Sequence, residues 1–406
     1  MISKNVVIVG LQATDSPIGS NCVNIAHELA RTGHRVLYIN YPFDTRSLLN
    51  QLFRPTEQTP IRMEVLKGKT EERQKIADNL HAVYPRVVNA SIGFLPDGNL
   101  FDFFNRMNNK KLARLIQRHL SALDMKEFIL FNDSDMVRSF YLNDLLNPVC
   151  SVYYSRDNLI SQPYFARHGK RLEAQLIAKS DLAVANSLYL ADYCRQFNPN
   201  SHYVGQGCET DLFKYGEERV RPKDMPQFNK PVIGYIGALL KLRLDVTLLE
   251  ELAQRHPEWQ FVFVGPEDEA FEKSTLHAFD NVLFTGPKKP AELPAYLNCF
   301  DVAINPQELN EMTVGNYPRK IDEYLAMGKP VVATMTRAMV VFEEVVYLAE
   351  SAEEYSTHIQ KALDEDTEVL RKKRSDFALS HTWEASTKEI LAAVEKAIGS
   401  AGQEER

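Results

Sequence analysis

Short apolar runs alternate with amphipathic helical segments along most of the chain. The first run, residues 5–10, is followed by a glycine-containing loop, a helical segment at 21–33 and a second apolar run at 35–40. Residues 231–237 begin the same order again. Short apolar runs separated by amphipathic helices predict parallel strands that are covered by helices on both faces. Two such beginnings predict two doubly wound α/β domains.

Further apolar runs extend both series. In the first half they lie at 127–133, 151–155, 181–187 and 202–207, and in the second half at 260–265, 281–286, 301–306 and 330–334. The polar, proline-containing segment 216–230 predicts a linker between domains at 1–215 and 231–381. From Thr382 the pattern indicates one helix with no strand after it, so 382–406 is expected to form a helix and tail that pack on an existing element.

Polar and glycine residues gather where the predicted strands end. In open α/β sheets, ligands bind at the carboxyl ends of the strands. The segments 10–20 and 154–157 are expected at that edge of the first domain, and 237–245 and 306–323 at that edge of the second. The pattern therefore predicts a cleft between the two domains with one wall from each.

Residues 310–334 form the most informative segment, because a polar loop leads into a short helix and a β-branched strand. Backbone N–H groups at a helix start attract anions, and Lys320 lies beside this start. Glu323 follows three residues later, on a neighbouring position of the same face. A cation for phosphate and a carboxylate for sugar hydroxyls suit a nucleotide-sugar site. The simpler alternative is an exposed charge pair.

The loop after the 231–237 strand contains Lys241 and Arg243. Glycine allows close backbone approach to a ligand, and basic side chains pair with phosphate. The alternative is a solvated loop at a helix start. Neither this loop nor the N-terminal one has the G-x-G-x-x-G spacing of dinucleotide-binding enzymes, which argues against a nicotinamide-dependent dehydrogenase.

Composition excludes several function classes. The 406 residues carry a net charge of −7, and an acidic balance argues against a nucleic-acid partner. The five cysteines and ten histidines show no metal-ligand spacing, so neither a metal nor a cofactor is expected. No apolar run approaches the roughly 20 residues of a membrane-spanning helix, and no apolar leader opens the chain. A cytoplasmic protein is expected.

A family resemblance rests on one combined signature. Its members here are Asn310, Glu311, Thr313, Pro318, Lys320, Glu323, Tyr324, Leu325, Ala326, Gly328, Pro330, Val331 and Val332. This signature resembles the donor site of GT-B glycosyltransferases, in particular retaining family 4 and its bacterial branch resembling teichuronic acid biosynthesis glycosyltransferases. Further similarity extends over most of the chain, including HTWEAS at the start of the last helix.

The resemblance implies a GT-B architecture, with two Rossmann-like domains facing a cleft and a C-terminal helix crossing back to the first domain. It implies a transferase of cell-envelope polysaccharide biosynthesis that moves a sugar from a nucleotide diphosphate sugar to a hydroxyl of a glycan or lipid-linked acceptor. Glu323 would hold the ribose hydroxyls, while Lys320 and Arg243 would neutralise the leaving diphosphate. Such a reaction needs no metal and retains the anomeric configuration.

The resemblance also assigns the remaining site residues. The other donor-side positions are Gly237, Lys241, Asn310, Thr313, Gly315, Pro318 and Ile321. Gly19 and Ser20 correspond to the acceptor-side loop, and Asp157 is the candidate protein base, with a helix-capping aspartate as the alternative. The chain departs from the family at Gly315, where the first of two glutamates is usual, and at Ala238, where an arginine is usual.

Two further readings of the function stay open. A GT-B-fold nucleotide-sugar epimerase would need acid/base groups around the sugar, and a catalytically silent nucleotide-sugar binding protein would need none. Separately, the segment 105–123 combines leucines at helical spacing with Arg106, Lys110 and Arg114. It predicts either peripheral contact with the cytoplasmic face of a membrane or an ordinary helix packed through its leucines.

Overall fold

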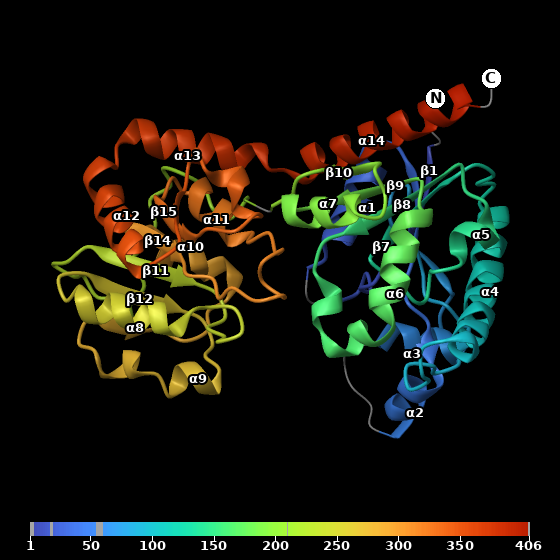
Figure 1. Ribbon diagram of the computed structural model, residues 1–406, viewed down its shortest axis with the longest axis horizontal. Helices are drawn as coiled ribbons and strands as arrows, with labels where there is room; N and C mark the ends of the chain where they lie inside the picture. Colours follow the sequence, from blue (N-terminus) through green and yellow to red (C-terminus); the bar gives the residue numbers. More distant parts are fainter. Residues whose placement is uncertain (1–3, 17–18, 54–59, 209, 405–406) are drawn as a thin grey trace. The chain divides into compact units, whose positions relative to one another are not determined.

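The computed structural model describes residues 4–16, 19–53, 60–208 and 210–404. Residues 17–18 of the predicted 10–20 loop, and 405–406 of the predicted tail, lie outside this range. The contacts divide the chain into two compact units, one of residues 1–205 and 383–406 and the other of residues 206–382. Each unit is built on a mainly parallel sheet, as the alternating pattern of apolar runs and helices predicts (Figure 1).

The first unit contains an eight-stranded sheet in the order β10-β9-β8-β7-β1-β2-β5-β4. Its strands are β1 (Asn5–Val9), β2 (Arg35–Ile39), β4 (Arg73–Ala77), β5 (Leu80–Val83), β7 (Ile129–Asp133), β8 (Cys150–Ser155), β9 (Leu182–Ala185) and β10 (Ser201–Tyr203). All neighbours are parallel except β4 and β5, which form a hairpin at the sheet edge. A separate pair joins β3 (Phe43–Asp44) to β6 (Val88–Asn89).

Helices cover both faces of this sheet. They are α1 (Asn21–Arg31), α2 (Thr45–Phe53), α3 (Pro60–Leu66), α4 (Asn99–Ala122), α5 (Leu142–Leu146), α6 (Pro163–Lys179), α7 (Leu188–Arg195) and α14 (Trp383–Glu404). Although α14 ends the chain, it packs on α1, β8 and β9, and Figure 1 shows it lying along the first unit. Its Ile390 and Val394 are buried in the same cluster as Val6 and Ile8 of β1.

The basic segment 105–123 lies within α4. Leu112, Leu115, Ile116 and Leu120 are buried in one cluster with strand residues of the same unit. The apolar face of this helix therefore forms part of the core, as the packed-helix alternative predicts.

The second unit contains a parallel six-stranded sheet in the order β13-β12-β11-β14-β15-β16. Its strands are β11 (Val232–Ile236), β12 (Gln260–Val264), β13 (Val282–Phe284), β14 (Val302–Asn305), β15 (Val331–Thr334) and β16 (Tyr347–Ala349). Its helices are α8 (Val246–Arg255), α9 (Glu269–Glu272), α10 (Leu293–Asn298), α11 (Lys320–Ala326), α12 (Ala352–Glu365) and α13 (Glu368–Ser380). Two buried clusters hold these elements together. Met225, from the segment 216–230, belongs to one of them.

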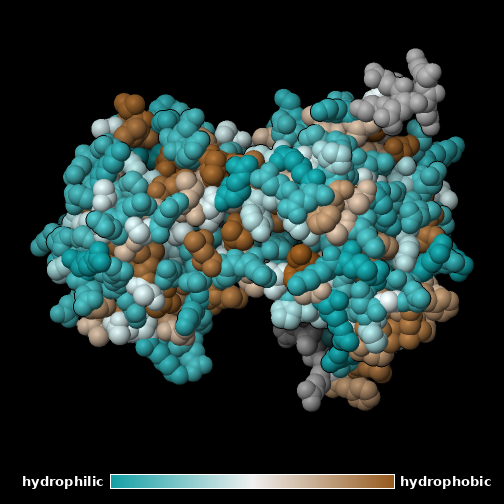
Figure 2. Space-filling view, in the orientation of Figure 1, coloured by the Kyte–Doolittle hydropathy of each residue, from teal (hydrophilic) through white to brown (hydrophobic). Residues whose placement is uncertain are grey.

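Among the described residues, no helix combines the length and apolar composition that a membrane crossing requires. Hydrophilic side chains dominate the face shown in Figure 2. Hydrophobic side chains gather on that face near α2 of the first unit, where Leu49, Leu52 and Phe53 are exposed.

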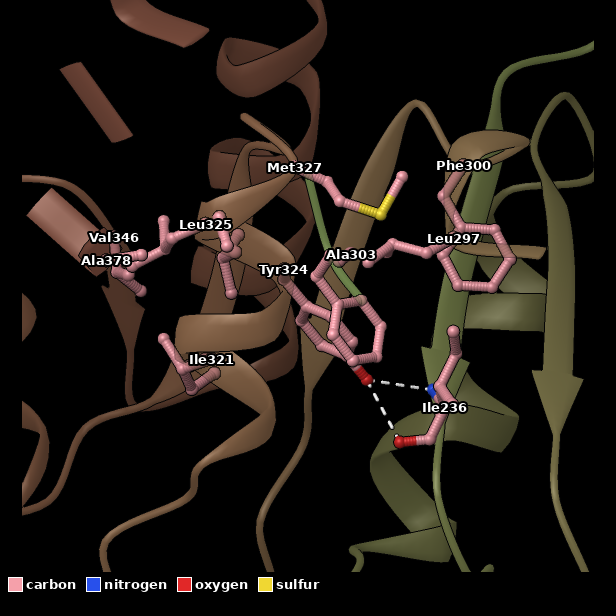
Figure 3. Packing of buried hydrophobic residues seen from close by; sticks show 14 of the residues in the cluster. Ile236, Leu297, Phe300, Ala303, Ile321, Tyr324, Leu325, Met327, Val346 and Ala378 are labelled. Atoms are coloured by element: carbon pink, nitrogen blue, oxygen red, sulfur yellow. Dashed lines mark hydrogen bonds between the residues drawn. The ribbon is translucent and has the colours of Figure 1, made fainter. Parts of the chain in front are cut away.

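Tyr324 joins α11 to the end of β11 (Figure 3). Its hydroxyl accepts a hydrogen bond from Ile236 N at 2.8 Å and donates one to Ile236 O at 3.1 Å. Strand β11 pairs with β14 at Ile233 and Gly234. Two residues later, where this pairing has ended, the tyrosine hydroxyl supplies hydrogen-bond partners for the backbone of Ile236. A buried backbone group without a partner is costly, and this contact therefore fixes the position of the helix against the sheet.

Replacing Tyr324 by phenylalanine should lower the free energy of unfolding by about 1–3 kcal/mol, because both Ile236 groups lose a buried partner. Chemical denaturation followed by circular dichroism measures the change. Tyr347→Phe is the matched control, since its hydroxyl bonds an exposed Glu365 carboxylate. Equal stability losses in the two variants would contradict the role given to Tyr324.

Candidate functional site

Two glycines bring the loops after β11 and β12 into contact. Gly237 N donates to Val264 O at 2.9 Å, and both Gly237 (φ 143°) and Gly265 (φ 155°) have backbone conformations that favour glycine. A Cβ atom on Gly265 would lie only 1.9 Å from Gly237 O. No other residue type fits at Gly265 without moving this backbone.

Lys320, the first residue of α11, lies against this glycine. A Cβ atom on Gly237 would be 2.9 Å from Lys320 Nζ. The ammonium donates a hydrogen bond to the Tyr235 hydroxyl and lies 4.0 Å from the centre of the Tyr235 ring. No carboxylate among the described residues pairs with it. The site therefore presents a positive charge, aimed by Tyr235, beside an open stretch of backbone.

Hydrogen bonds join the loop after β11 to the loop after β14. Leu244 bridges to Gln307, Glu308 N donates to Arg243 O at 3.0 Å, and Asn310 Nδ2 donates to Leu242 O at 2.8 Å. The side chain of Arg243 is exposed, and no described carboxylate forms an ion pair with it. The backbone of this basic loop is thus fixed while its guanidinium group faces solvent.

Lys241 belongs to the same loop. Its N–H donates to Asp268 Oδ2 at 2.9 Å, and its side chain is exposed. The loop therefore carries two solvent-facing cations, Lys241 and Arg243, at the carboxyl end of β11.

Asn310 and Thr313 shape the second loop from within. Asn310 Oδ1 accepts hydrogen bonds from Met312 N at 2.9 Å and Thr313 N at 3.1 Å. The Thr313 hydroxyl donates to Glu308 O and accepts from Asn310 N at 3.2 Å. The hydroxyl of Thr313, a predicted donor-side position, is thus engaged in hydrogen bonds inside the loop.

Of the other predicted residues in this segment, Ile321 and Gly315 are buried and Glu323 is partly exposed. Ile321 is 0% exposed within the core cluster, and its N–H donates to Pro318 O at 2.9 Å. Gly315 is buried, whereas Glu323 is partly exposed one helical turn after Lys320. Only Lys320 and Glu323 of α11 are therefore placed to meet a ligand through their side chains.

Sequence reasoning missed a buried polar cluster under the same helix. Asp322 is 0% exposed, and its carboxylate accepts hydrogen bonds from Cys208 Sγ at 3.0 Å and His381 Nδ1 at 2.7 Å. The Tyr317 hydroxyl also lies 3.0 Å from His381 Nδ1. Burial and the charge of Asp322 raise the pKa of the Cys208 thiol well above its usual range. These contacts tie both ends of this unit, near Cys208 and His381, to the helix that carries Lys320.

An Asp322→Asn substitution should lower the free energy of unfolding by about 1–3 kcal/mol, because it removes the charged acceptor of two hydrogen bonds in a buried cluster. Urea titration of the purified protein measures the effect. Asp376→Asn is the control, since that exposed carboxylate forms a surface ion pair with Lys372 at 3.3 Å. An Asp322 variant as stable as the control would show that the cluster does not hold α11.

The predicted segment 154–157 lies at the carboxyl end of β8, next to the end of β7. Asp133, at the end of β7, accepts hydrogen bonds from Leu11 N at 3.1 Å and Arg156 Nε at 2.7 Å. Arg156 also donates to Asp157 at 3.1 Å, and the Asp157 side chain is 46% exposed. The candidate base is therefore solvent-accessible and held by an arginine.

Gly19 and Ser20 directly precede α1. Gly19 is exposed, whereas Ser20 is the buried N-cap residue of that helix and its side chain makes no capping hydrogen bond. Within the described part of the chain, no three His, Cys, Asp or Glu side chains are grouped so that they could hold a metal ion.

Most of the second unit is similar to a known protein family. Residues 230–365 match the family model described as Glycosyl transferases group 1. Over 250 residues the chain is 27% identical to TuaH of Bacillus subtilis (strain 168), named for teichuronic acid biosynthesis as a glycosyltransferase. That match covers 58% of this chain and 62% of the relative, so it spans less than two thirds of the relative's length.

Solved structures resemble the whole chain. Anabaena HepE in complex with UDP has 16% identity and a TM-score of 0.62, covering 97% of this chain and all of the neighbour. Sucrose-phosphate synthase from Thermosynechococcus elongatus has 14% identity and a TM-score of 0.62, covering 98% and 99%. The lipopolysaccharide outer core galactosyltransferase WaaB has 11% identity and a TM-score of 0.64, covering 97% and 99%. The predicted GT-B fold is confirmed.

Proposed function

Because residues 230–365 match the family model described as Glycosyl transferases group 1 and the chain has a GT-B fold, we propose that the protein transfers a sugar from a nucleotide diphosphate sugar to a hydroxyl of a glycan or lipid-linked acceptor. The observation that carries this proposal is the placement of Lys320 Nζ beside Gly237, without a carboxylate partner among the described residues. Among the described residues the ammonium group bonds the Tyr235 hydroxyl and no carboxylate, so its charge can pair with a phosphate that approaches the Gly237 backbone.

The leaving nucleotide diphosphate gains negative charge as the bond to the sugar breaks. Fixed positive charges at that position stabilise the transition state more than the ground state. Lys320 is the first such charge and Arg243 the second, on a loop whose backbone is held by Glu308 and Asn310. These two cations supply the electrostatic stabilisation that a metal ion supplies elsewhere, so the proposed reaction is metal-independent.

Glu323 is the proposed partner of the ribose hydroxyls. It lies on the same face of α11 as Lys320, three residues further along. A carboxylate accepts hydrogen bonds from both hydroxyls of a ribose, so the diphosphate and the ribose would lie along one side of this helix. Anabaena HepE, a structural neighbour, has been solved with UDP and with UDP-glucose, which supports a nucleotide sugar as the donor.

The acceptor side of the reaction is proposed to lie on the first unit. Gly19 and Ser20 begin α1, and Asp157 offers a solvent-accessible carboxylate at the end of β8. In the retaining scheme, the acceptor hydroxyl attacks the face that the diphosphate leaves and a phosphate oxygen takes its proton. Asp157 is the group that would take this role if the proton passes to the protein.

Incubation with a panel of nucleotide sugars and glycan acceptors tests the proposed activity. Transfer releases free nucleoside diphosphate only when an acceptor is present. An altered sugar still attached to its nucleotide would establish an epimerase, and nucleotide-sugar binding without turnover would establish a silent binding protein.

A Lys320→Met substitution should reduce turnover by about 10²- to 10³-fold, because it removes a charge aimed at the developing negative charge. Steady-state release of nucleoside diphosphate measures this loss, and thermal unfolding checks that the variant is folded. Lys372→Met, on the exposed surface of α13, is the control and should keep full turnover. Unchanged turnover in the Lys320 variant would remove the basis of the proposal.

A Glu323→Gln substitution should weaken binding of the nucleoside diphosphate by about 10- to 100-fold, since hydrogen bonds to a charged group contribute about 1.5–3 kcal/mol. Isothermal titration calorimetry with UDP and other nucleoside diphosphates measures the dissociation constants. Glu395→Gln, on α14 of the first unit, serves as the control. A nucleoside diphosphate that binds the Glu323 variant and the wild-type protein equally would contradict the ribose contact.

A further inference from the structure

A cavity lies wholly within the first unit. Its volume is about 540 Å³, and all of its lining residues fall between Leu11 and His168. They come from the chain after β1, β2, β6 and β7, and from α2, α3, α4 and α6. The volume falls in the range of sites for small organic ligands, and the carboxyl ends of parallel strands are where such ligands bind in open α/β sheets.

Arg62 is the unusual residue of this cavity. It is only 6% exposed, and no carboxylate among the described residues lies within ion-pair distance. Its guanidinium carbon lies 3.8 Å from the centre of the Phe43 ring and 4.1 Å from that of Tyr41. Desolvation lowers the pKa of Arg62, and interactions with Tyr41 and with the charge of Asp15 oppose this shift. Burying an arginine without a paired anion costs folding free energy, and the described part of the chain supplies no carboxylate within ion-pair distance of Arg62.

A second guanidinium lines the same cavity. The Arg138 side chain is partly exposed, pairs with Asp135 at 2.6 Å, and has its guanidinium carbon 4.9 Å from the centre of the Tyr41 ring. The charge of Arg138 lowers the pKa of Arg62, although desolvation is the larger cause. Two guanidinium groups therefore lie around the Tyr41 ring, and the carboxylates of Asp44 and Asp135 also line the cavity.

Other lining residues have hydrogen-bonding capacity that no described group uses. Asn89 Oδ1, Asn105 Nδ2 and His168 Nε2 are buried and lack a hydrogen-bond partner. Native proteins leave few such atoms unsatisfied. One amide oxygen, one amide nitrogen and one ring nitrogen without partners in the same cavity suit a ligand that carries several hydroxyl groups.

Aromatic rings complete the lining. Phe101 stacks on His168 with ring centres 3.9 Å apart, and Tyr164 is 80% exposed at the cavity. Flat aromatic surfaces suit the C–H face of a sugar ring or an aromatic aglycone, because such faces are apolar. The cavity therefore combines apolar surface, hydroxyl-binding groups and positive charge.

From these observations we propose that the first-unit cavity binds the acceptor through an anionic group, a carboxylate or phosphate carried by a saccharide, which Arg62 and Arg138 hold. The proposal rests on the transferase function, because it specifies the acceptor for that reaction. The anion supplies the charged partner that no described carboxylate gives to Arg62, and the sugar hydroxyls supply partners for the Asn89, Asn105 and His168 atoms.

Three probes with the same aromatic group test this proposal on the full-length protein. They are para-nitrophenyl β-D-glucuronide, para-nitrophenyl phosphate and the neutral para-nitrophenyl β-D-glucoside. Isothermal titration calorimetry should show at least one anionic probe binding about tenfold or more tighter than the glucoside. Preference for the glucuronide identifies a carboxylate-bearing acceptor, and preference for the phosphate identifies a phosphorylated one. Equal affinity for all three probes, or binding of none, overturns the proposal.

Arg62→Met should abolish the preference for the anionic probe while leaving the melting temperature unchanged or higher, because an uncompensated buried charge is removed. Arg46→Met, which removes an exposed arginine of α2, should keep the wild-type preference. An Arg62 variant with wild-type probe affinity would assign that arginine a structural role and overturn the proposal.

UDP affinity and turnover, measured on the same samples, separate this proposal from the transferase function. If the donor reacts but the Arg62 variant keeps the wild-type KM for the acceptor, the cavity proposal fails and the function stands. If no nucleotide sugar reacts, the function fails, whereas Arg62-dependent binding of an anionic probe still assigns the cavity.

Discussion

The close approach of Lys320 to Gly237 is the interaction on which the account of this protein depends. The absence of a side chain at Gly237 leaves room for the ammonium group, which the Tyr235 hydroxyl and ring hold in place. Gly265 then allows the neighbouring loop to pack against the Gly237 carbonyl group. Any larger residue at these glycines would move either the cation or the backbone beside it.

The rest of the second unit fixes the helix that presents this cation. Tyr324 bonds both backbone groups of Ile236 at the end of β11, and Asp322 joins α11 to Cys208 and His381. The short helix α11 therefore has one set of buried residues that anchors it and one set of accessible residues that can meet a ligand. Buried faces anchor it to the sheet and to the segments near Cys208 and His381, while Lys320 and Glu323 remain on the accessible face. Positioning by fixed dipoles and charges is what electrostatic catalysis requires.

The sequence predicted the fold well because short apolar runs followed by amphipathic helices have few other solutions. It missed the hairpin β4–β5, whose edge strand β4 has no buried residue, and so carries no apolar run. Lys320 and Glu323 could be predicted because they are charged residues in a glycine- and proline-containing segment. Tyr235, Asp322 and Arg62 could not, since a buried tyrosine within a strand, a helical aspartate and a surface-type arginine differ from ordinary residues only through their tertiary contacts. Thr313 shows the opposite case, because its polar side chain is used inside the loop.

The most direct measurement is a crystal structure of the protein with bound UDP. The account predicts that a β-phosphate oxygen lies within ion-pair distance of Lys320 Nζ, about 4 Å or less, and that the diphosphate runs over the Gly237 backbone. A diphosphate bound elsewhere on the second unit, with Lys320 still directed only at Tyr235, would contradict it.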